Sequence, residues 1–310
     1  MLGAIVINSG RSSIPFCWIG SHSVRENAMS VVLITGCSSG FGLESALAFA
    51  ANGDTVVATM RNVERASELN DRARAAGVDI DVVALDVASD ESVSAAVKDV
   101  LSRHGRIDVL VNNAGVGYPG AVETIDLALA REVLETNFWG TVRMIQAVLP
   151  QMRENGDGVI INVSSIAARI PPVPFFSWYA VSKHGVGLLS EALFMELMGS
   201  GVRVVCIEPG FYKTLIGSSV MPPDTSTVYG AEEAWVGSFY VKGVRDGGDP
   251  ADVAAAIVRA SMDPSTPFHV IIPAENEELA NLTMSFEETV AFQMAMLEGT
   301  VGPRPKRASN

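Results

Sequence analysis

Short apolar runs alternate with helical apolar patterns along most of this 310-residue chain. The runs are rich in Val and Ile, which is typical of strands buried on both faces of a parallel sheet. This alternation predicts strand–helix–strand crossovers and an α/β fold: a single doubly wound parallel sheet of about seven strands with helices on both faces. The expected strands are residues 31–35, 55–60, 80–85, 107–112, 158–164, 202–207 and 268–272.

Helical patterns fall between these runs. In open parallel sheets, ligands bind outside the carboxyl ends of the strands. Gly36, Asn113, Ser165 and Pro209 each follow an expected strand, so one crevice is predicted to gather them. The expected helices are residues 41–52, 62–76, 90–104, 122–154, 178–199 and 250–262.

Tyr179 and Lys183 lie four residues apart in one of these helical patterns. Side chains at this spacing share a helix face, so both can reach one reacting atom. A cation held near a phenol favours the phenolate and lowers its pKa from about 10. The pair therefore indicates acid–base chemistry. An exposed lysine and a half-buried tyrosine on an ordinary helix would show the same spacing, so the rest of the chain has to decide.

A glycine-rich segment, TGCSSGFG at residues 35–42, joins the first expected strand to the first helix. Glycines allow close approach of the backbone, and a helix N-terminus offers free N–H groups and positive dipole charge. Strand, glycine-rich turn and helix in this order predict a pyrophosphate-binding cradle.

In these motifs the chain resembles the short-chain dehydrogenases/reductases, over roughly residues 29–273. Residues 35–42 look like the family's coenzyme motif and residues 209–214 like the segment that covers the nicotinamide. The other matching elements are Asn112-Asn113-Ala114-Gly115, Asn137, Ser164-Ser165 and the pair Tyr179 and Lys183. The resemblance implies a Rossmann-like fold and hydride transfer between a ketone or aldehyde and an alcohol.

The resemblance also implies the catalytic roles. Tyr179 is the expected acid–base catalyst, and Lys183 lowers its pKa and holds the cofactor ribose. Ser165 donates a hydrogen bond to the substrate oxygen, and Asn137 anchors a water for proton relay. Ser165 lies one position further from Tyr179 than is usual in the family, and an insertion in the proline-rich loop at residues 171–174 explains this. Ser164 is the alternative catalytic serine.

The expected cofactor contacts gather at the strand ends. They are Gly36, Ser38, Ser39, Gly40, Phe41, Gly42, Arg61, Asp86, Val87, Asn113, Ala114, Gly115, Tyr179, Lys183, Pro209, Gly210 and Thr214. A carboxylate after the second strand would bind the adenosine 2′-hydroxyl. The chain has no acid there, and Arg61 could pair with a 2′-phosphate. NADP(H) is therefore favoured over NAD(H).

Three regions of the chain are expected to have different characters. Residues 1–28 are interpreted as a disordered extension or a mis-assigned start before Met29. Residues 29–275 form the dinucleotide-binding domain, and residues 210–249 within it form the substrate-loop region that the resemblance implies. Residues 276–310 supply a C-terminal helix and tail, where the helix covers the pocket mouth, a partner subunit or the core.

Composition excludes several partners. Net charge is −13 without a basic cluster, which argues against nucleic acid, and no apolar stretch of about 18 residues predicts a membrane span. Three cysteines without ligand spacing predict no metal site and a reducing, cytoplasmic setting. We expect a small carbonyl or alcohol substrate and, from the resemblance, a homodimer or homotetramer.

The substrate is expected to be apolar. Phe175, Phe176, Trp178, Phe211 and Ile216 flank the predicted site, and Arg169 and Lys213 are the cations nearest to it in the sequence. Two other functions stay open. One is a sugar-nucleotide epimerase or dehydratase, and the other is a catalytically silent NADP(H)-binding regulator.

Overall fold

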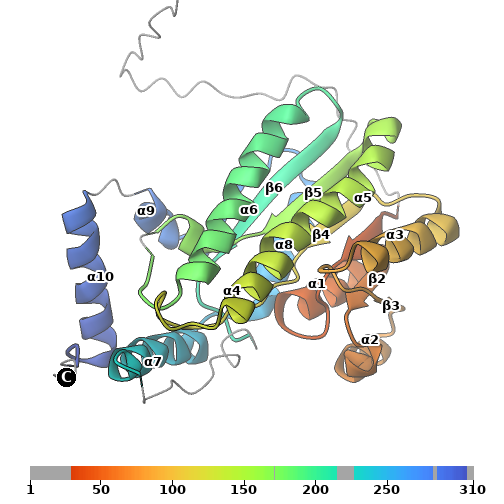
Figure 1. Cartoon of the computed structure of the whole chain (residues 1–310). Helices are drawn as coiled ribbons and strands as arrows, with labels where there is room; N and C mark the ends of the chain where they lie inside the picture. Colours follow the sequence, from red (N-terminus) through yellow and green to blue (C-terminus); the bar gives the residue numbers. More distant parts are fainter. Residues whose placement is uncertain (1–28, 171, 215–226, 282–284, 306–310) are drawn as a thin grey trace, which may run out of the picture.

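A single parallel sheet forms the centre of the molecule (Figure 1). The computed structural model describes residues 29–170, 172–214, 227–281 and 285–305. In this part of the chain the sheet has seven strands in the order β3-β2-β1-β4-β5-β6-β7, which confirms the predicted fold class. The strands are β1 Val31–Ile34, β2 Thr55–Met60, β3 Asp81–Ala84, β4 Val109–Asn112, β5 Gly158–Val163, β6 Val202–Pro209 and β7 His269–Ile272.

The central strands are apolar on both faces because helices cover both. Alternate side chains of β1 point to opposite clusters: Ile34 packs with Phe49 of α1 and Ile257 of α8, and Leu33 with Met144 of α5. Chain order reverses between β1 and β4, which leaves a crevice beyond their carboxyl ends. The covering helices are α1 Gly40–Ala51, α2 Ser67–Ala76, α3 Asp90–His104, α5 Gly140–Asn155, α6 Ser177–Glu196 and α8 Pro250–Met262.

Residues 122–154 do not form the single helix that the apolar pattern predicts. Helix α4, Leu127–Leu134, begins where the Asp126 side chain accepts a bond from Ala128 N, and a π-helical turn at Glu135–Trp139 separates it from α5. Such turns widen a helix locally and often mark functional positions. The turn contains Asn137, whose side chain bonds to the backbone of Val116. Apolar periodicity does not register a one-residue widening.

The region predicted as a substrate loop contains a helix that the sequence pattern did not predict, α7 Gly230–Asp246. The C-terminal segment forms α9 Asn276–Ala280 and α10 Phe286–Val301, and α10 packs against α7 at one end of the molecule (Figure 1). Trp235 Nε1 on α7 donates to Gly302 O at 2.8 Å. Residues 1–28 and the middle of the expected loop lie outside the described residues.

Two further contacts strengthen this end. Arg304 forms an ion pair with Glu232, which is 2% exposed on α7. The Phe176 ring at the start of α6 stacks on Tyr240 of α7, so α6, α7 and α10 form one apolar cluster. Within the described residues no helix is long and apolar enough to cross a membrane.

Candidate active site

One cavity of about 840 Å³ lies along the carboxyl ends of the strands. Its first part follows the glycine-rich turn after β1 and the ends of β2, β3 and β4. Its second part lies between the segment after β5, the start of α6, the end of β6, and helices α7 and α10. Nearly all predicted site residues line it, and the exceptions are Asn137 and Gly42.

The glycine-rich turn leaves room for a phosphate group. Gly36 and Gly40 have φ values of +74° and +58°, which side-chain-bearing residues rarely adopt. The Ser39 side chain does not cap α1, and the first turn of α1 carries no acid, so the first N–H groups are free to bind an anion. The backbone of Asn113 and Ala114 bonds to Thr35 Oγ1 at 3.0 Å, which holds the end of β4 against this turn.

Gly42 has a packing role instead. A Cβ atom there would lie 2.4 Å from Gly36 O and 2.5 Å from Asn113 Nδ2. Its hydrogen lets α1 start directly against the β1 turn, so it shapes the cradle without lining the cavity.

The adenosine end of the cavity contains cations. Arg61 is 62% exposed in its side chain, and its Nη1 lies 3.9 Å from Glu132 Oε1. Asn62 and Arg65 line the same end, beside the predicted residues Asp86 and Val87. Sequence reasoning missed Arg65, because it falls one turn beyond the strand end. The available signal was a second arginine four residues after Arg61, close enough to reach the same end of the cavity.

Tyr179 and Ser165 are brought together at the centre of the cavity, where their side chains hydrogen-bond to each other. Burial raises the pKa of the Tyr179 phenol, and the bond from Ser165 offsets this in part. Lys183 Nζ lies 5.8 Å from the Tyr179 ring centroid and donates to Val163 O at 2.8 Å. Burial lowers the pKa of Lys183 to about 8. The expected lowering of the Tyr179 pKa by Lys183 stays a prediction.

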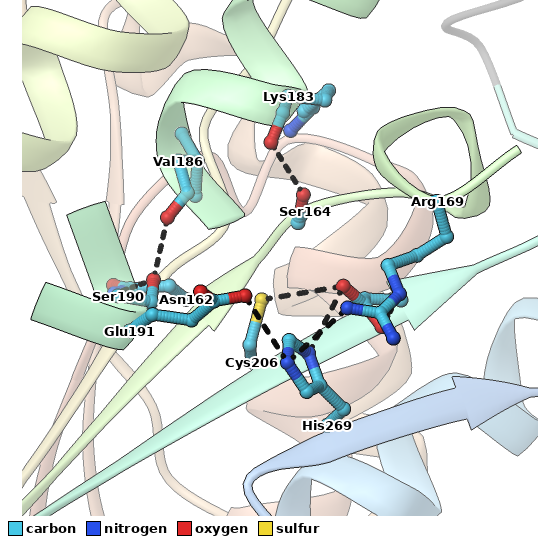
Figure 2. A network of polar contacts seen from close by, with 10 residues as sticks. Asn162, Ser164, Arg169, Lys183, Val186, Ser190, Glu191, Cys206 and His269 are labelled. Atoms are coloured by element: carbon cyan, nitrogen blue, oxygen red, sulfur yellow. Dashed lines mark hydrogen bonds and ion pairs between the residues drawn. The ribbon is translucent and has the colours of Figure 1, made fainter. Parts of the chain in front are cut away.

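The two candidate serines point in different directions. Ser164 Oγ donates to the backbone oxygen of Lys183 at 2.8 Å, as Figure 2 shows. Ser165 Oγ accepts from Ala167 N at 3.1 Å and lies 3.5 Å from Pro209 O, beside the Tyr179 hydroxyl. The geometry favours Ser165 as the serine that reaches a substrate oxygen.

Asn137 lies behind the cavity wall and is 1% exposed. Its Nδ2 donates to Val116 O and Ser182 Oγ, both at 2.9 Å, and its Oδ1 accepts from Val116 N at 2.8 Å. These bonds join the loop after β4 to the helix that carries Tyr179. Asn137 Oδ1 and Lys183 Nζ also lie close to the same side of Gly115.

Comparison with known proteins decides the family. A family model described as short chain dehydrogenase matches residues 30–224. The chain belongs to the short-chain dehydrogenase/reductase family. An uncharacterized oxidoreductase, YusZ of Bacillus subtilis, is 38% identical over 73% of this chain and 82% of its own length. Retinol dehydrogenase 8 of Bos taurus is 37% identical over 75% of this chain and 78% of its own length. The protein is thus an oxidoreductase with a dinucleotide-binding fold.

Solved structures agree. A short-chain dehydrogenase from Streptomyces avermitilis has a TM-score of 0.74 and 33% identity, covering 88% of this chain and 98% of its own. A metagenomic short-chain oxidoreductase in complex with NADP has a TM-score of 0.64 and 28% identity, covering 78% of this chain and 96% of its own. The 3-ketoacyl-(acyl-carrier-protein) reductase of Brucella melitensis, complexed with NADH, has a TM-score of 0.65 and 30% identity, with the same coverage.

The substrate end of this short-chain dehydrogenase/reductase is apolar. Phe176 and Phe211 line it as the sequence predicted, but Phe175 and Trp178 do not, and Ile216 lies outside the described residues. Two residues that sequence reasoning missed, Tyr240 of α7 and Met296 of α10, complete the wall. The remaining predicted contacts, Pro209, Gly210 and Thr214, also line the cavity.

The cation predicted near the substrate, Arg169, belongs to another group (Figure 2). Arg169 lies 3.9 Å from the fully buried Glu208 carboxylate and 3.3 Å from His269 Nε2, and it does not line the cavity. Glu208, His269 and Cys206 place three potential metal-ligand atoms within 4.8 Å. Arg169 places a positive charge beside the buried Glu208 carboxylate, and this pair links the segment after Ser165 to β6.

The cradle geometry predicts the effect of one methyl group. Gly42→Ala should lower the free energy of unfolding by about 2–3 kcal/mol, because the Gly36 backbone and the Asn113 side-chain amide must both move. It should also weaken dinucleotide binding. Chemical unfolding and calorimetric titration measure the two effects. Gly299→Ala in α10 is the matched control, since its Cβ meets nothing within 4 Å and alanine favours a helix. A Gly42→Ala protein as stable as the parent would contradict the packing role.

Proposed function

We propose that this protein is an NADP(H)-dependent oxidoreductase that interconverts a ketone or aldehyde and an alcohol, on a small to medium apolar substrate. One observation carries the proposal. The hydrogen-bonded hydroxyls of Ser165 and Tyr179 face a cavity with a phosphate cradle at one end and apolar walls at the other. A substrate oxygen placed between the two hydroxyls would meet one proton donor and one hydrogen-bond donor.

The chemistry divides between cofactor and protein. A bound nicotinamide supplies a hydride to a carbonyl carbon or accepts one from an alcohol. In reduction, Tyr179 donates its proton to the carbonyl oxygen, and Ser165 stabilises the developing negative charge by donating a hydrogen bond. Burial raises the pKa of Tyr179, so the phenol stays protonated at neutral pH. This state suits the proton donor that reduction requires.

Lys183 and Asn137 support this pair. Lys183 Nζ donates one hydrogen bond to Val163 O, and its other two N–H groups can bind the ribose hydroxyls of the cofactor. Asn137 joins the loop at Val116 to α6 through its amide. We assign Lys183 to ribose binding and Asn137 to holding the loop and relay water in place.

The adenosine end supports NADP(H). Its lining includes Arg61 and Arg65, and no acid stands directly after β2, so a 2′-phosphate would meet two guanidinium groups. Glu132 lies 3.9 Å from Arg61, and this exposed, loose pair is readily exchanged for a phosphate. One related structure binds NADP and another NADH, so this local charge pattern is the basis for the preference.

The apolar wall supports a hydrophobic substrate. Val173, Phe176, Phe211 and Phe239 supply most of it, and neither Arg169 nor Lys213 reaches the cavity. The related retinol dehydrogenase 8 is named for a hydrophobic alcohol. Walls of this kind bind apolar molecules mainly by removing their surface from water.

The proposed reaction requires the Tyr179 hydroxyl. In an NADPH-oxidation assay over apolar ketones and aldehydes, Tyr179→Phe should lose at least about 10²-fold in kcat/KM. NADPH affinity should change little, since the aromatic ring is kept. Calorimetric titration of NADPH into parent and variant provides the control. Turnover within tenfold of the parent would remove Tyr179 from this role.

The two serines should differ. Ser165→Ala should lower kcat by about 10²-fold, as expected when one donor to a developing oxyanion is lost. Ser164→Ala removes a hydroxyl bonded to the backbone of Lys183, so it should cost about 1 kcal/mol of stability and little activity. Steady-state kinetics and thermal unfolding of both variants test this. The reverse order of activities would assign the role to Ser164.

Cofactor preference is tested at Arg61. Charge-assisted hydrogen bonds contribute about 1.5–3 kcal/mol, so Arg61→Ala should weaken NADPH binding roughly ten- to a hundredfold. NADH binding should hardly change, because NADH lacks the 2′-phosphate, and added salt should reduce the difference.

The control for this test is Arg74→Ala. Arg74 is exposed, pairs with Asp71 on α2 and does not line the cavity. It should leave both nucleotide affinities unchanged in calorimetric titrations. Equal losses for NADPH and NADH in Arg61→Ala, or a parent that binds NADH more tightly, would refute the preference for NADP(H).

A further inference from the structure

The substrate end of the cavity contains a second phenol, that of Tyr240. The residue lies on α7 and lines the cavity together with Tyr179. Its ring stacks on Phe176 at a centroid distance of 3.6 Å, with Phe211 and Phe239 edge-on at 5.7 Å. Contacts on several sides hold the ring in a defined position, so the direction of its hydroxyl is defined as well.

The Tyr240 hydroxyl has no hydrogen-bond partner among the residues that the structure describes. Other hydroxyls near the site do have partners: Ser165 bonds to Ala167 N and Tyr179, and Ser164 to Lys183 O. Burial raises the pKa of Tyr240, and Tyr179 raises it further, because the two phenols are close enough to interact. The hydroxyl is therefore neutral, and it can donate one hydrogen bond and accept others.

Packing alone does not account for a tyrosine here. The neighbouring rings are phenylalanines, and a phenylalanine at position 240 would make the same ring contacts. A polar group that loses water without gaining a partner costs about 1–3 kcal/mol. An entirely apolar molecule filling the cavity would impose that cost on the Tyr240 hydroxyl. A molecule with an oxygen at this place would remove it.

We infer that Tyr240 is a second polar recognition point, and that the substrate is an apolar ketone, aldehyde or alcohol with an additional oxygen away from the reacting carbon. The additional oxygen is a hydroxyl, carbonyl or ester group that bonds to the Tyr240 hydroxyl while the reacting oxygen lies between Tyr179 and Ser165. This assignment rests on the proposed function and defines its substrate class more narrowly. A site built to bond a substrate oxygen discriminates against the analogue that lacks it.

The test compares 2-octanone with its hydroxylated analogues, each carrying one hydroxyl between the fourth and the eighth carbon. Binding is measured by calorimetry in the presence of the oxidised cofactor, with which a ketone cannot react, and kcat/KM is measured with the reduced cofactor. The parent should bind at least one hydroxyketone about three- to tenfold more tightly than 2-octanone, the value of one hydrogen bond. Tyr240→Phe should abolish this gain, and it should bind 2-octanone at least as tightly as the parent does, because no hydroxyl is then left without a partner.

Tyr229→Phe is the matched control. It also removes a phenol hydroxyl, one that bonds to Glu123 outside the cavity, and it should keep the gain. The inference is overturned if no hydroxyl position improves binding to the parent, or if Tyr240→Phe weakens 2-octanone and the hydroxyketones equally. Failure of the proposed function is distinguishable, because the hydroxyketones would then bind with the gain that depends on Tyr240 but would not be reduced.

Discussion

The close contact between the turn after β1 and the end of β4 is the constraint on which the rest of this structure depends. Chain order in the sheet reverses between these strands, so two crossovers leave in opposite directions and a crevice opens between them. Asn113 bridges the gap by donating to Thr35 O at 2.8 Å and to Gly36 O at 3.1 Å. Gly42 lets α1 start against this bridge. Without that approach, the helix N-terminus would not face the cavity.

A chain of buried amides and hydroxyls extends from β4 across the sheet to α6, the helix that carries Tyr179 and Lys183. Asn112 Nδ2 donates to Asn162 Oδ1, and Asn162 Nδ2 donates to Ser190 Oγ, both at 2.8 Å. Ser190 Oγ continues to Val186 O on α6 (Figure 2). Buried polar groups accept few alternative partners, so such a chain specifies one position of α6 on the sheet. Tyr179 and Lys183 depend on that position.

The substrate end is built differently. It depends on apolar and aromatic packing between α6, α7 and α10, with the ion pair of Arg304 and Glu232 at its edge. The cofactor end uses backbone groups and glycines, which suit one shape of ligand. The substrate end uses side chains from α6, α7 and α10, which lie outside the sheet. Tyr240 is the residue that most clearly separates it from a plain apolar pocket.

Much of the architecture could be read from the sequence, because apolar periodicity and glycine spacing reflect local geometry. The strands, their parallel order and the helices α1, α3, α6 and α8 lie close to their predicted positions, and the glycine-rich cradle forms where residues 35–42 predicted it. The same pattern hid the π-helical turn at Asn137, because a one-residue widening hardly changes the apolar spacing. It also hid helix α7, because glycines interrupt the helical pattern there.

Only the tertiary structure decided which side chains meet. Sequence spacing placed Tyr179 and Lys183 on one helix. Burial raises the pKa of the Tyr179 phenol and lowers that of Lys183, whose ammonium donates to the backbone oxygen of Val163. The tertiary structure also places Ser165 beside Tyr179 and directs Ser164 away from it. Arg169 lies beside Glu208 and not at the expected substrate site. Spacing along a chain determines which face a residue occupies. Its partners, and therefore its charge and reactivity, come from segments that are distant in the sequence.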